Sequence, residues 1–269
     1  MEQKKVQTLV GVLLIILILA ACSAPPVSSP PQTQTTNTQV PQGTSTESAT
    51  AVASDGLCTN AYYPVRQGAT WNYKSTGGPA GEYSFTDSIM SVREEGFTLS
   101  TQTGDRTRTQ EWTCTPEGLA ALQLGGAPTA MLNSQNIQLN LDVTNSSGVT
   151  FPGQMNVGDQ WQQSMEVTGN VTAFNEEAEA TGTAQMNFAA VGNESVTVPA
   201  GTFDALKVNV DVTLNINATY QGINLPVTFS GKYTYWFVQN VGWVKASGTG
   251  SVLGSSFSET TELQSYNVP

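Results

Sequence analysis

The side chains that could do chemistry in this 269-residue sequence are its 21 carboxylates and its three cysteines, Cys22, Cys58 and Cys114. The sequence has no histidine, so it lacks the usual general base, the imidazole of serine and cysteine triads, and the commonest metal ligand. A glycosidase needs two carboxylates at a set separation, and the sequence singles out no such pair. We therefore predict no catalytic residue, no metal ligand and no cofactor, and we expect the protein not to be an enzyme.

Glu176, Glu177 and Glu179 form a local group of carboxylates that a cation could bind. Clustered carboxylates at the end of a strand more often form a solvated turn, and the sequence lacks the spaced ligands of a calcium loop. We therefore interpret this group as structural.

The first 21 residues have the layout of a signal peptide. Lys4 and Lys5 precede an uncharged apolar stretch at residues 9–21, as in the positive and apolar regions of such peptides. The stretch is shorter than the roughly 20 residues that span a bilayer, which disfavours a retained transmembrane helix. Residues 19–22 (LAAC) resemble the lipobox of bacterial lipoproteins. The alternative is an ordinary secreted protein with a coincidental cysteine.

The lipobox resemblance implies that residues 1–21 are a signal peptide that is removed. It also implies that Cys22 receives a diacylglycerol on its sulfur and a further acyl chain, such as palmitate, on its amino group. Two or three chains anchor firmly, since each buried methylene contributes roughly 0.8 kcal/mol. Ser23 rather than Asp follows the cysteine, so the family analogy gives no inner-membrane retention signal. The expected location is the extracytoplasmic side of the cell envelope, on the cytoplasmic membrane or on an outer membrane if one is present.

With Cys22 lipidated, Cys58 and Cys114 remain, in a compartment where disulfides persist. We expect these two cysteines to pair. The bond would close a loop of about 57 residues and contribute roughly 4 kcal/mol in the chain-entropy model. The alternative is two separate buried thiols.

The chain is acidic, with a net charge of −11. Removal of residues 1–21 takes away Glu2, Lys4 and Lys5, which leaves a net charge of −12 on the mature chain. Nucleic-acid phosphates and anionic lipid headgroups repel such a chain. We expect no nucleic-acid partner, and membrane attachment only through the N-terminal lipid.

Composition divides the mature chain into two parts. Residues 22–56 consist largely of Ser, Thr, Gln, Pro and Ala, and we expect them to form a disordered tether with a reach on the order of 30 Å. Residues 57–269 are long enough for one β domain, or two fused halves, with a substantial core.

Apolar and polar residues alternate over much of the last third of the sequence. Every even position in residues 206–220 is apolar, and after Gln221 and Gly222 the pattern resumes on odd positions. A period of two predicts strands with one buried face, and Gln221-Gly222 predicts the turn of a long hairpin. Similar runs occur at residues 178–190 and 137–143. Because no amphipathic helix is expected, we predict an all-β fold of long antiparallel strands.

An internal repeat is indicated by two pairs of similar segments. Residues 63–71 and 151–161 share an aromatic residue, a proline and a GxxW pattern, and Trp112 and Trp236 are each followed six residues later by glycine. We predict two related units, each resembling a half-barrel or a sandwich. These units would cover residues 57–126 and 145–269. The alternative is chance recurrence of these residue types at strand ends.

Residues 198–203 (VPAGTF), 235–237 (YWF) and 241–245 (VGWVK) together resemble a C-terminal signature of extracytoplasmic β-rich lipoprotein domains. Some of these domains are related to the half-barrels of the lipoprotein-carrier (Lol) superfamily. That superfamily binds acyl chains between a curved sheet and covering helices. The resemblance transfers no functional residue to this chain.

Strands with one continuous apolar face must cover that face with another sheet, with a closed barrel, or with a ligand. The first functional hypothesis is therefore a non-catalytic binding module for a lipid or other hydrophobic small molecule near the membrane. The alternative is a surface interaction or scaffold protein without a ligand cavity, whose protein partner is unknown. A hydrolase of envelope polymers is a distant third.

Overall fold

The computed structural model describes residues 56–78, 80–124, 137–173, 176–252 and 254–269. These residues form strands and loops without a helix, and therefore contain no apolar helix that could cross a membrane. The predicted all-β, antiparallel fold class is confirmed. The strands are β1 (Thr70–Gly77), β2 (Tyr83–Arg93), β3 (Gly96–Thr103), β4 (Arg106–Thr115), β5 (Gly118–Ala121), β6 (Ile137–Gly148), β7 (Phe151–Pro152), β8 (Gln160–Ala173), β9 (Glu176–Val198), β10 (Gly201–Tyr220), β11 (Ile223–Val238), β12 (Gly242–Val252) and β13 (Ser255–Asn267).

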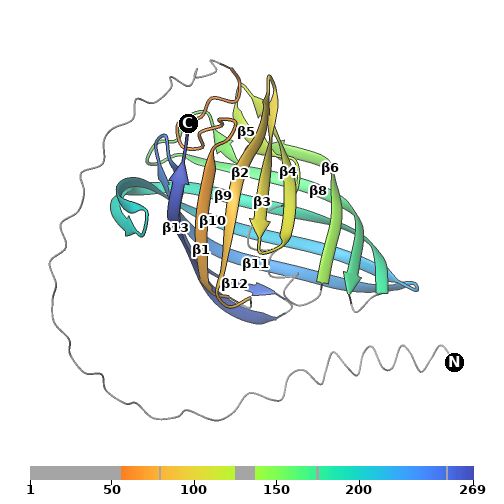
Figure 1. Ribbon diagram of the computed structural model, residues 1–269. Coiled ribbons are helices and arrows are strands. Elements are labelled where there is room, and N and C mark those ends of the chain that lie inside the picture. The colour runs from red at the N-terminus through yellow and green to blue at the C-terminus, as the bar shows by residue number, and fades with distance from the viewer. Residues whose placement is uncertain (1–55, 79, 125–136, 174–175, 253) are drawn as a thin grey trace, which may run out of the picture. The chain divides into compact units, whose positions relative to one another are not determined.

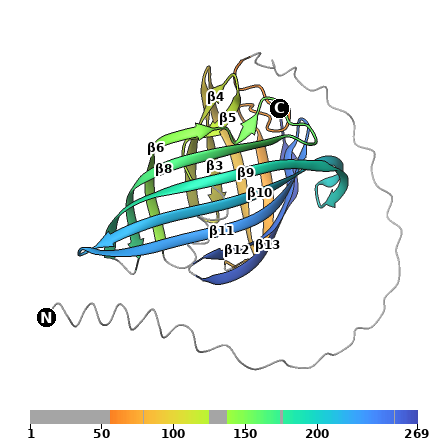
Figure 2. The ribbon, with the colours of Figure 1, turned by 180° about the vertical axis from the view of Figure 1, so that it is seen from behind.

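All of these strands belong to one sheet, in the order β6-β8-β9-β10-β11-β12-β13-β1-β2-β3-β4-β5-β7. The sheet curls, so that β1 to β4 stand opposite β8 to β11 (Figures 1 and 2). Among the described residues, no pairing joins the two ends of this order. Of the two expected architectures, the half-barrel is therefore the one that forms.

The hairpin of β10 and β11 has the register that the alternation predicts. Leu206 pairs with Phe237 at one end and Tyr220 pairs with Ile223 at the other. The connecting residues Gln221 and Gly222 both have positive φ, 50° and 80°, as a two-residue turn that follows the twist of the strands requires. The apolar positions of both strands line the concave, inner face of the sheet, where most of them are buried.

Irregularities in register help the sheet to curl. A β-bulge adds a residue to one strand and increases the local twist and bend. Such shifts occur in β2, β6, β9, β12 and β13, where the extra residues are Met90, Thr144, Val191, Val244 and Gln264.

The two GxxW segments have the same local geometry. The amide of Gly68 donates to the Ile89 carbonyl at 2.9 Å, and that of Gly158 donates to the Ala190 carbonyl at 2.8 Å. Both glycines have positive φ, 84° and 100°, a conformation that L side chains rarely adopt. Each segment leads directly into a long strand, β1 or β8. The relation between the whole units 57–126 and 145–269 stays a prediction.

Candidate ligand-binding site

The inner face of the sheet is apolar but incompletely covered. Alternation along the strands places most of the apolar side chains on this face, which includes the buried residues Leu214, Tyr73 and Leu263. Trp243 reaches the same face because the register of β12 shifts at Val244, so that Trp243 pairs with Phe237. Several large apolar side chains of the inner face nevertheless remain only partly buried. They are Phe85, Met186, Val212, Tyr235, Trp243 and Phe257. Apolar surface left open on a concave face is typical of a ligand-binding site.

Aromatic rings dominate the part of this face contributed by β1, β2, β11 and β12. Tyr73 stacks on Trp243 with centroids 3.8 Å apart and planes inclined by 5°. Phe85 stacks on the same tyrosine at 5.1 Å, and Tyr235 meets Trp243 edge-on at 5.8 Å. The Tyr73 hydroxyl donates to the Trp243 carbonyl at 2.9 Å, which fixes this group in place. The rings therefore form a rigid apolar surface with few polar atoms.

Two inner-facing glycines of β12 give large rings the space they occupy. A Cβ atom on Gly248 would lie 2.4 Å from Cδ1 of Tyr233, and one on Gly250 would lie 2.2 Å from Cζ of Phe257. Both separations are too short for real contacts, so the rings of Tyr233 and Phe257 lie directly over backbone. The glycines that the sequence places in β12 thus shape the inner surface.

Glu259 is a buried carboxylate at one end of the inner face. It pairs with Gly77 at the end of β1, close to the β1–β2 turn, and it is 7% exposed. Its Oε1 accepts hydrogen bonds from Ser75 Oγ at 2.5 Å and from the Tyr83 hydroxyl at 2.9 Å. Thr261 Oγ1 donates in turn to Ser75 Oγ at 3.1 Å. The side chain is therefore held in one orientation.

Tyr233 and Tyr235 of β11 lie close enough to Glu259 to interact with it electrostatically. Burial is the main cause that raises the pKa of Tyr233, and the neighbouring Tyr235 and Glu259 add to it. Burial and Glu259 together raise the pKa of Tyr235 to about 12. The Tyr233 hydroxyl is buried without a hydrogen-bond partner among the described residues, which is uncommon in folded proteins. We call Glu259, Ser75, Tyr83, Tyr233 and Tyr235 the Glu259 cluster.

Asp87 is a second carboxylate on the inner face. It pairs with Trp71 of β1 and with Thr101 of β3, whose Oγ1 donates to Asp87 Oδ1 at 2.6 Å. Burial raises the pKa of Asp87 from its ordinary value of 3.8 to about 6, although the bond from Thr101 opposes the shift. Desolvation of the charged form outweighs that one hydrogen bond.

The raised pKa predicts that Asp87→Asn stabilises the protein at neutral pH. Between pH ~4 and ~6 the folded state keeps a proton that the unfolded state has lost, so Asp87 contributes stability below pH 4 that is lost as the pH rises through 6. Asparagine keeps an acceptor for Thr101 and has no charge to desolvate. We expect the variant and wild type to have similar unfolding free energies at pH 4, and the variant to gain about 2 kcal/mol by pH 7.5.

Urea unfolding at pH 4, 5, 6 and 7.5 measures this difference. Asp142→Asn is the matched control, because Asp142 is exposed on β6, and its difference from wild type should not change over this pH range. A constant difference for Asp87→Asn would show that burial does not perturb this carboxyl.

The outer face is polar. A shallow groove of about 450 Å³ crosses β6, β8, β9 and β10, and its lining includes Asp142, Asn170, Glu179 and Asn217. A second groove, of about 680 Å³, crosses β10 to β13. Elsewhere on this face the Lys207 ammonium lies 5.6 Å from the ring centre of Trp236, and Trp236 Nε1 donates to Glu194. Most of the side chains that line these two grooves are therefore polar, whereas those of the inner face are mostly apolar.

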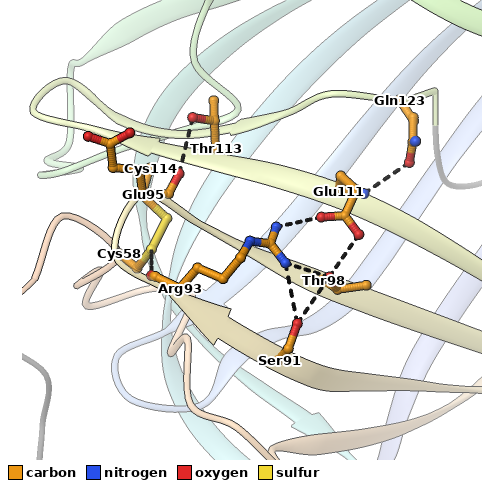
Figure 3. Close-up of polar contacts among 9 residues, drawn as sticks. All are labelled: Cys58, Ser91, Arg93, Glu95, Thr98, Glu111, Thr113, Cys114 and Gln123. Atoms are coloured by element: carbon orange, nitrogen blue, oxygen red, sulfur yellow. Dashed lines mark hydrogen bonds and ion pairs between the residues drawn. A yellow bond between two sulfur atoms is a disulfide. The ribbon is translucent and has the colours of Figure 1, made fainter.

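Of the cysteines singled out in the sequence, Cys22 lies outside the described residues. Cys58 and Cys114 form a disulfide with a Cα–Cα distance of 5.0 Å, and both are buried (Figure 3). The bond attaches the segment before β1 to β4. Beside it, the Arg93 guanidinium pairs with Glu111 across β3 (Figure 3). These contacts hold strands together and present no reactive group.

The three glutamates singled out in the sequence lie at the start of β9, where one of them accepts a hydrogen bond from a tyrosine. The Tyr220 hydroxyl donates to Glu176 Oε2 at 2.8 Å, and Glu177 and Glu179 share the same strand. No cluster of three or more metal-ligating side chains occurs in the described ranges.

Sequence reasoning missed the polar residues of the inner face, namely Asp87, Tyr83 and Glu259. One signal was available for Glu259. Phe257, Glu259 and Leu263 occupy alternate positions of one strand, so a carboxylate stands in the row of core residues. No comparable signal marks Asp87. Its place on the inner face is evident only once its pairing with Trp71 of β1 and Thr101 of β3 is known.

A family model described as DUF3108-like matches residues 111–251. Among solved structures, the chain is similar to a protein provisionally described as exported, with a YmcC-like fold, from Bacteroides fragilis NCTC 9343. The identity is 14%, the match covers 78% of this chain and 100% of that chain, and the TM-score is 0.46. A provisionally described lipoprotein from Parabacteroides distasonis ATCC 8503 is 16% identical, with 78% of this chain and 99% of that chain covered and a TM-score of 0.42. The hypothetical lipoprotein YmcC from Escherichia coli (K12) is 11% identical, with 77% of this chain and 87% of that chain covered and a TM-score of 0.32. No curated protein is significantly similar in sequence.

Proposed function

The chain belongs to the DUF3108-like family, whose model covers more than half of its residues, and from this premise we propose that its curled sheet binds a lipid or another hydrophobic ligand. The β unit would be held on the extracytoplasmic side of an envelope membrane by lipid on Cys22, as the lipobox-like residues 19–22 suggest. Binding rather than catalysis is proposed because the sequence has no histidine and no nucleophile motif.

The observation that carries the proposal is the open apolar surface on the inner face. Val212, Trp243 and Phe257 face the concave side of the sheet and keep part of their surface exposed. Covering such surface gains roughly 25 cal/mol per Å². A ligand that lies along these side chains would supply the cover that a second sheet or a helix supplies in other folds.

A neutral fluorescent probe tests the proposal. We suggest N-phenyl-1-naphthylamine, because it carries no charge for the acidic chain to attract or repel. The protein would be residues 22–269 with Cys22→Ser, exported with an ordinary signal peptide, so that no detergent competes with the probe. We expect saturable binding with a Kd of about 10 μM, the affinity typical of a ligand of this size.

A pair of adjacent substitutions locates the probe. Val212 faces inward and is partly exposed, whereas Thr213 faces outward on the same strand. Val212→Trp should fill the inner space and weaken probe binding about tenfold, and Thr213→Trp should leave the affinity unchanged. Near-ultraviolet circular dichroism checks that both variants are folded.

An absence of saturable binding by the folded wild-type protein would contradict the proposal. So would equal effects of Val212→Trp and Thr213→Trp. Either result would favour the alternative of an interaction protein whose inner face has no ligand.

A further inference from the structure

The Glu259 cluster lies at one end of the inner face, so that one end of a ligand bound along this face could reach it. Ser75 is near the end of β1, Tyr83 begins β2, and Glu259 is near the start of β13. The β1–β2 turn and the β12–β13 turn lie at the same end of the sheet (Figure 1). The partly exposed rings of Tyr235 and Phe257 belong to the strands that carry the cluster or border it. A chain bound along the inner face can therefore end at Glu259.

Among the described residues, the carboxylate of Glu259 has no positively charged partner. In the part of the chain that the structure describes, the ion pairs join Lys74 to Glu82, Arg93 to Glu111, Lys207 to Glu194, Lys232 to Asp211, and Lys245 to Glu262. Neither Glu259 nor Asp87 takes part in any of these pairs. A buried carboxylate is expensive unless a cation or several hydrogen bonds compensate it. Glu259 has two side-chain donors, Ser75 and Tyr83, and both bond to Oε1.

The Tyr233 hydroxyl is a second, independent observation at the same place. Tyr233 is 6% exposed, and its hydroxyl has no partner among the described residues. Tyr233 and Glu259 both pair with Gly248 of β12, one from each side, and the ring of Tyr233 lies over this glycine. A buried hydroxyl is normally hydrogen-bonded. An N–H donor lying between the two groups could bond to Glu259 and to the phenolic oxygen at once.

The rings around the cluster also favour positive charge. The face of the Tyr235 ring carries the negative part of the aromatic quadrupole, which attracts ammonium groups. The described ion pairs named above take up four lysines and Arg93. Three further arginines are described: Arg66 donates to the Pro269 carbonyl, and Arg106 and Arg108 belong to β4, four strands from β13 in the sheet order.

We propose that the Glu259 cluster binds the protonated amine head of an amphiphile whose apolar chain lies along the inner face. This inference rests on the proposed function and adds to it the class of ligand. The ammonium would donate hydrogen bonds to the carboxylate of Glu259 and to the Tyr233 hydroxyl. The chain would cover the partly exposed surface of Phe257, Val212 and Trp243.

Three ligands of equal chain length test the proposal. Decylamine is protonated at pH 7, decan-1-ol is neutral, and decanoate is negative, and each would compete with N-phenyl-1-naphthylamine for residues 22–269 with Cys22→Ser. We expect decylamine to displace the probe at a concentration about tenfold lower than decanol. Decanoate should be the weakest competitor, because two carboxylates already lie on the inner face.

A pair of charge-neutralising variants separates the cluster from the general negative charge of the chain. Glu259→Gln keeps an acceptor for Ser75 and Tyr83 but removes the charge, and it should abolish the tenfold preference while decanol binds as before. Glu166→Gln makes the same change of charge on the exposed outer side of β8 and should retain the preference. Near-ultraviolet circular dichroism verifies folding, and the wild-type comparison stands even if Glu259→Gln does not fold.

The outcomes distinguish the two proposals. If decanol matches or exceeds decylamine on the wild-type protein, the amine proposal is wrong while hydrophobic binding stands, and a hydroxyl head becomes the better ligand. If Glu259→Gln and Glu166→Gln lose the preference for decylamine over decanol equally, the preference comes from the overall charge of the chain. That result would also overturn the amine site. If the probe binds and none of the three competitors displaces it, the amine proposal is wrong while hydrophobic binding stands. If the probe does not bind, the proposed function itself fails.

Discussion

Replacing Cys22 by serine is expected to abolish acylation of this protein completely. The lipid is attached to a thiol in the family that residues 19–22 resemble, and a serine hydroxyl is a far weaker nucleophile than a cysteine. Without the modified cysteine the lipoprotein peptidase has no substrate, so the chain should keep residues 1–21. The variant would then remain at the membrane through its uncleaved apolar stretch rather than through lipid. Incorporation of labelled palmitate and the intact mass of the chain are the measurements.

The paired substitution of Cys58 and Cys114 by alanine is the control for the acylation experiment. Both residues lie within the β unit and are buried in a disulfide, so their replacement should leave the palmitate label on Cys22. If Cys22→Ser were processed to the same mass as wild type, or still carried the label, the lipobox interpretation would be wrong.

Removing the Cys58–Cys114 disulfide is expected to lower the free energy of unfolding by about 4 kcal/mol. The bond joins residues 56 positions apart, and in the chain-entropy model a loop of this length restricts the unfolded chain by about that amount. Most single domains have only about 5–15 kcal/mol of stability in total. The loss would therefore be a large part of it, and the midpoint of urea unfolding should fall accordingly.

The measurement is urea unfolding of the Cys58→Ala, Cys114→Ala double variant, followed by tryptophan fluorescence. Wild-type protein with dithiothreitol should approach the same midpoint, because the reductant removes the same cross-link. The variant Cys22→Ser alone should unfold like wild type, since Cys22 is not part of the disulfide. A double variant with the wild-type midpoint would show that the cross-link does not restrict the unfolded chain.

The hairpin of β10 and β11 shows how much of this fold can be predicted from sequence. Its alternation extends over some fifteen residues on each side of Gln221 and Gly222, and both turn residues adopt the positive φ that the turn requires. Pattern and turn are local properties, so the register and the buried face follow from them. The Cys58–Cys114 bond was expected for a different reason, because lipid on Cys22 would leave only two cysteines.

The Glu259 cluster could not be predicted in the same way. Ser75 and Glu259 are separated by 184 residues, and they meet because β13 pairs with β1. Tyr233 joins them through β12, which lies between β11 and β13. No local pattern specifies which strands become neighbours in a curled sheet. The single continuous sheet was likewise undetermined, because alternation is the same in a sandwich and in a half-barrel.

The position of β13 in the sheet determines when the sheet can be completed during folding. β13 (Ser255–Asn267) follows every other strand along the chain, yet it lies between β12 and β1 in the sheet. The first five strands and the strands from β8 to β12 are therefore joined edge to edge only when β13 is in place. A chain that crosses a membrane from its N-terminus presents this strand after all the others. Its sheet then cannot be completed during passage, and the contacts that complete it are among the most distant in sequence, which makes folding slow.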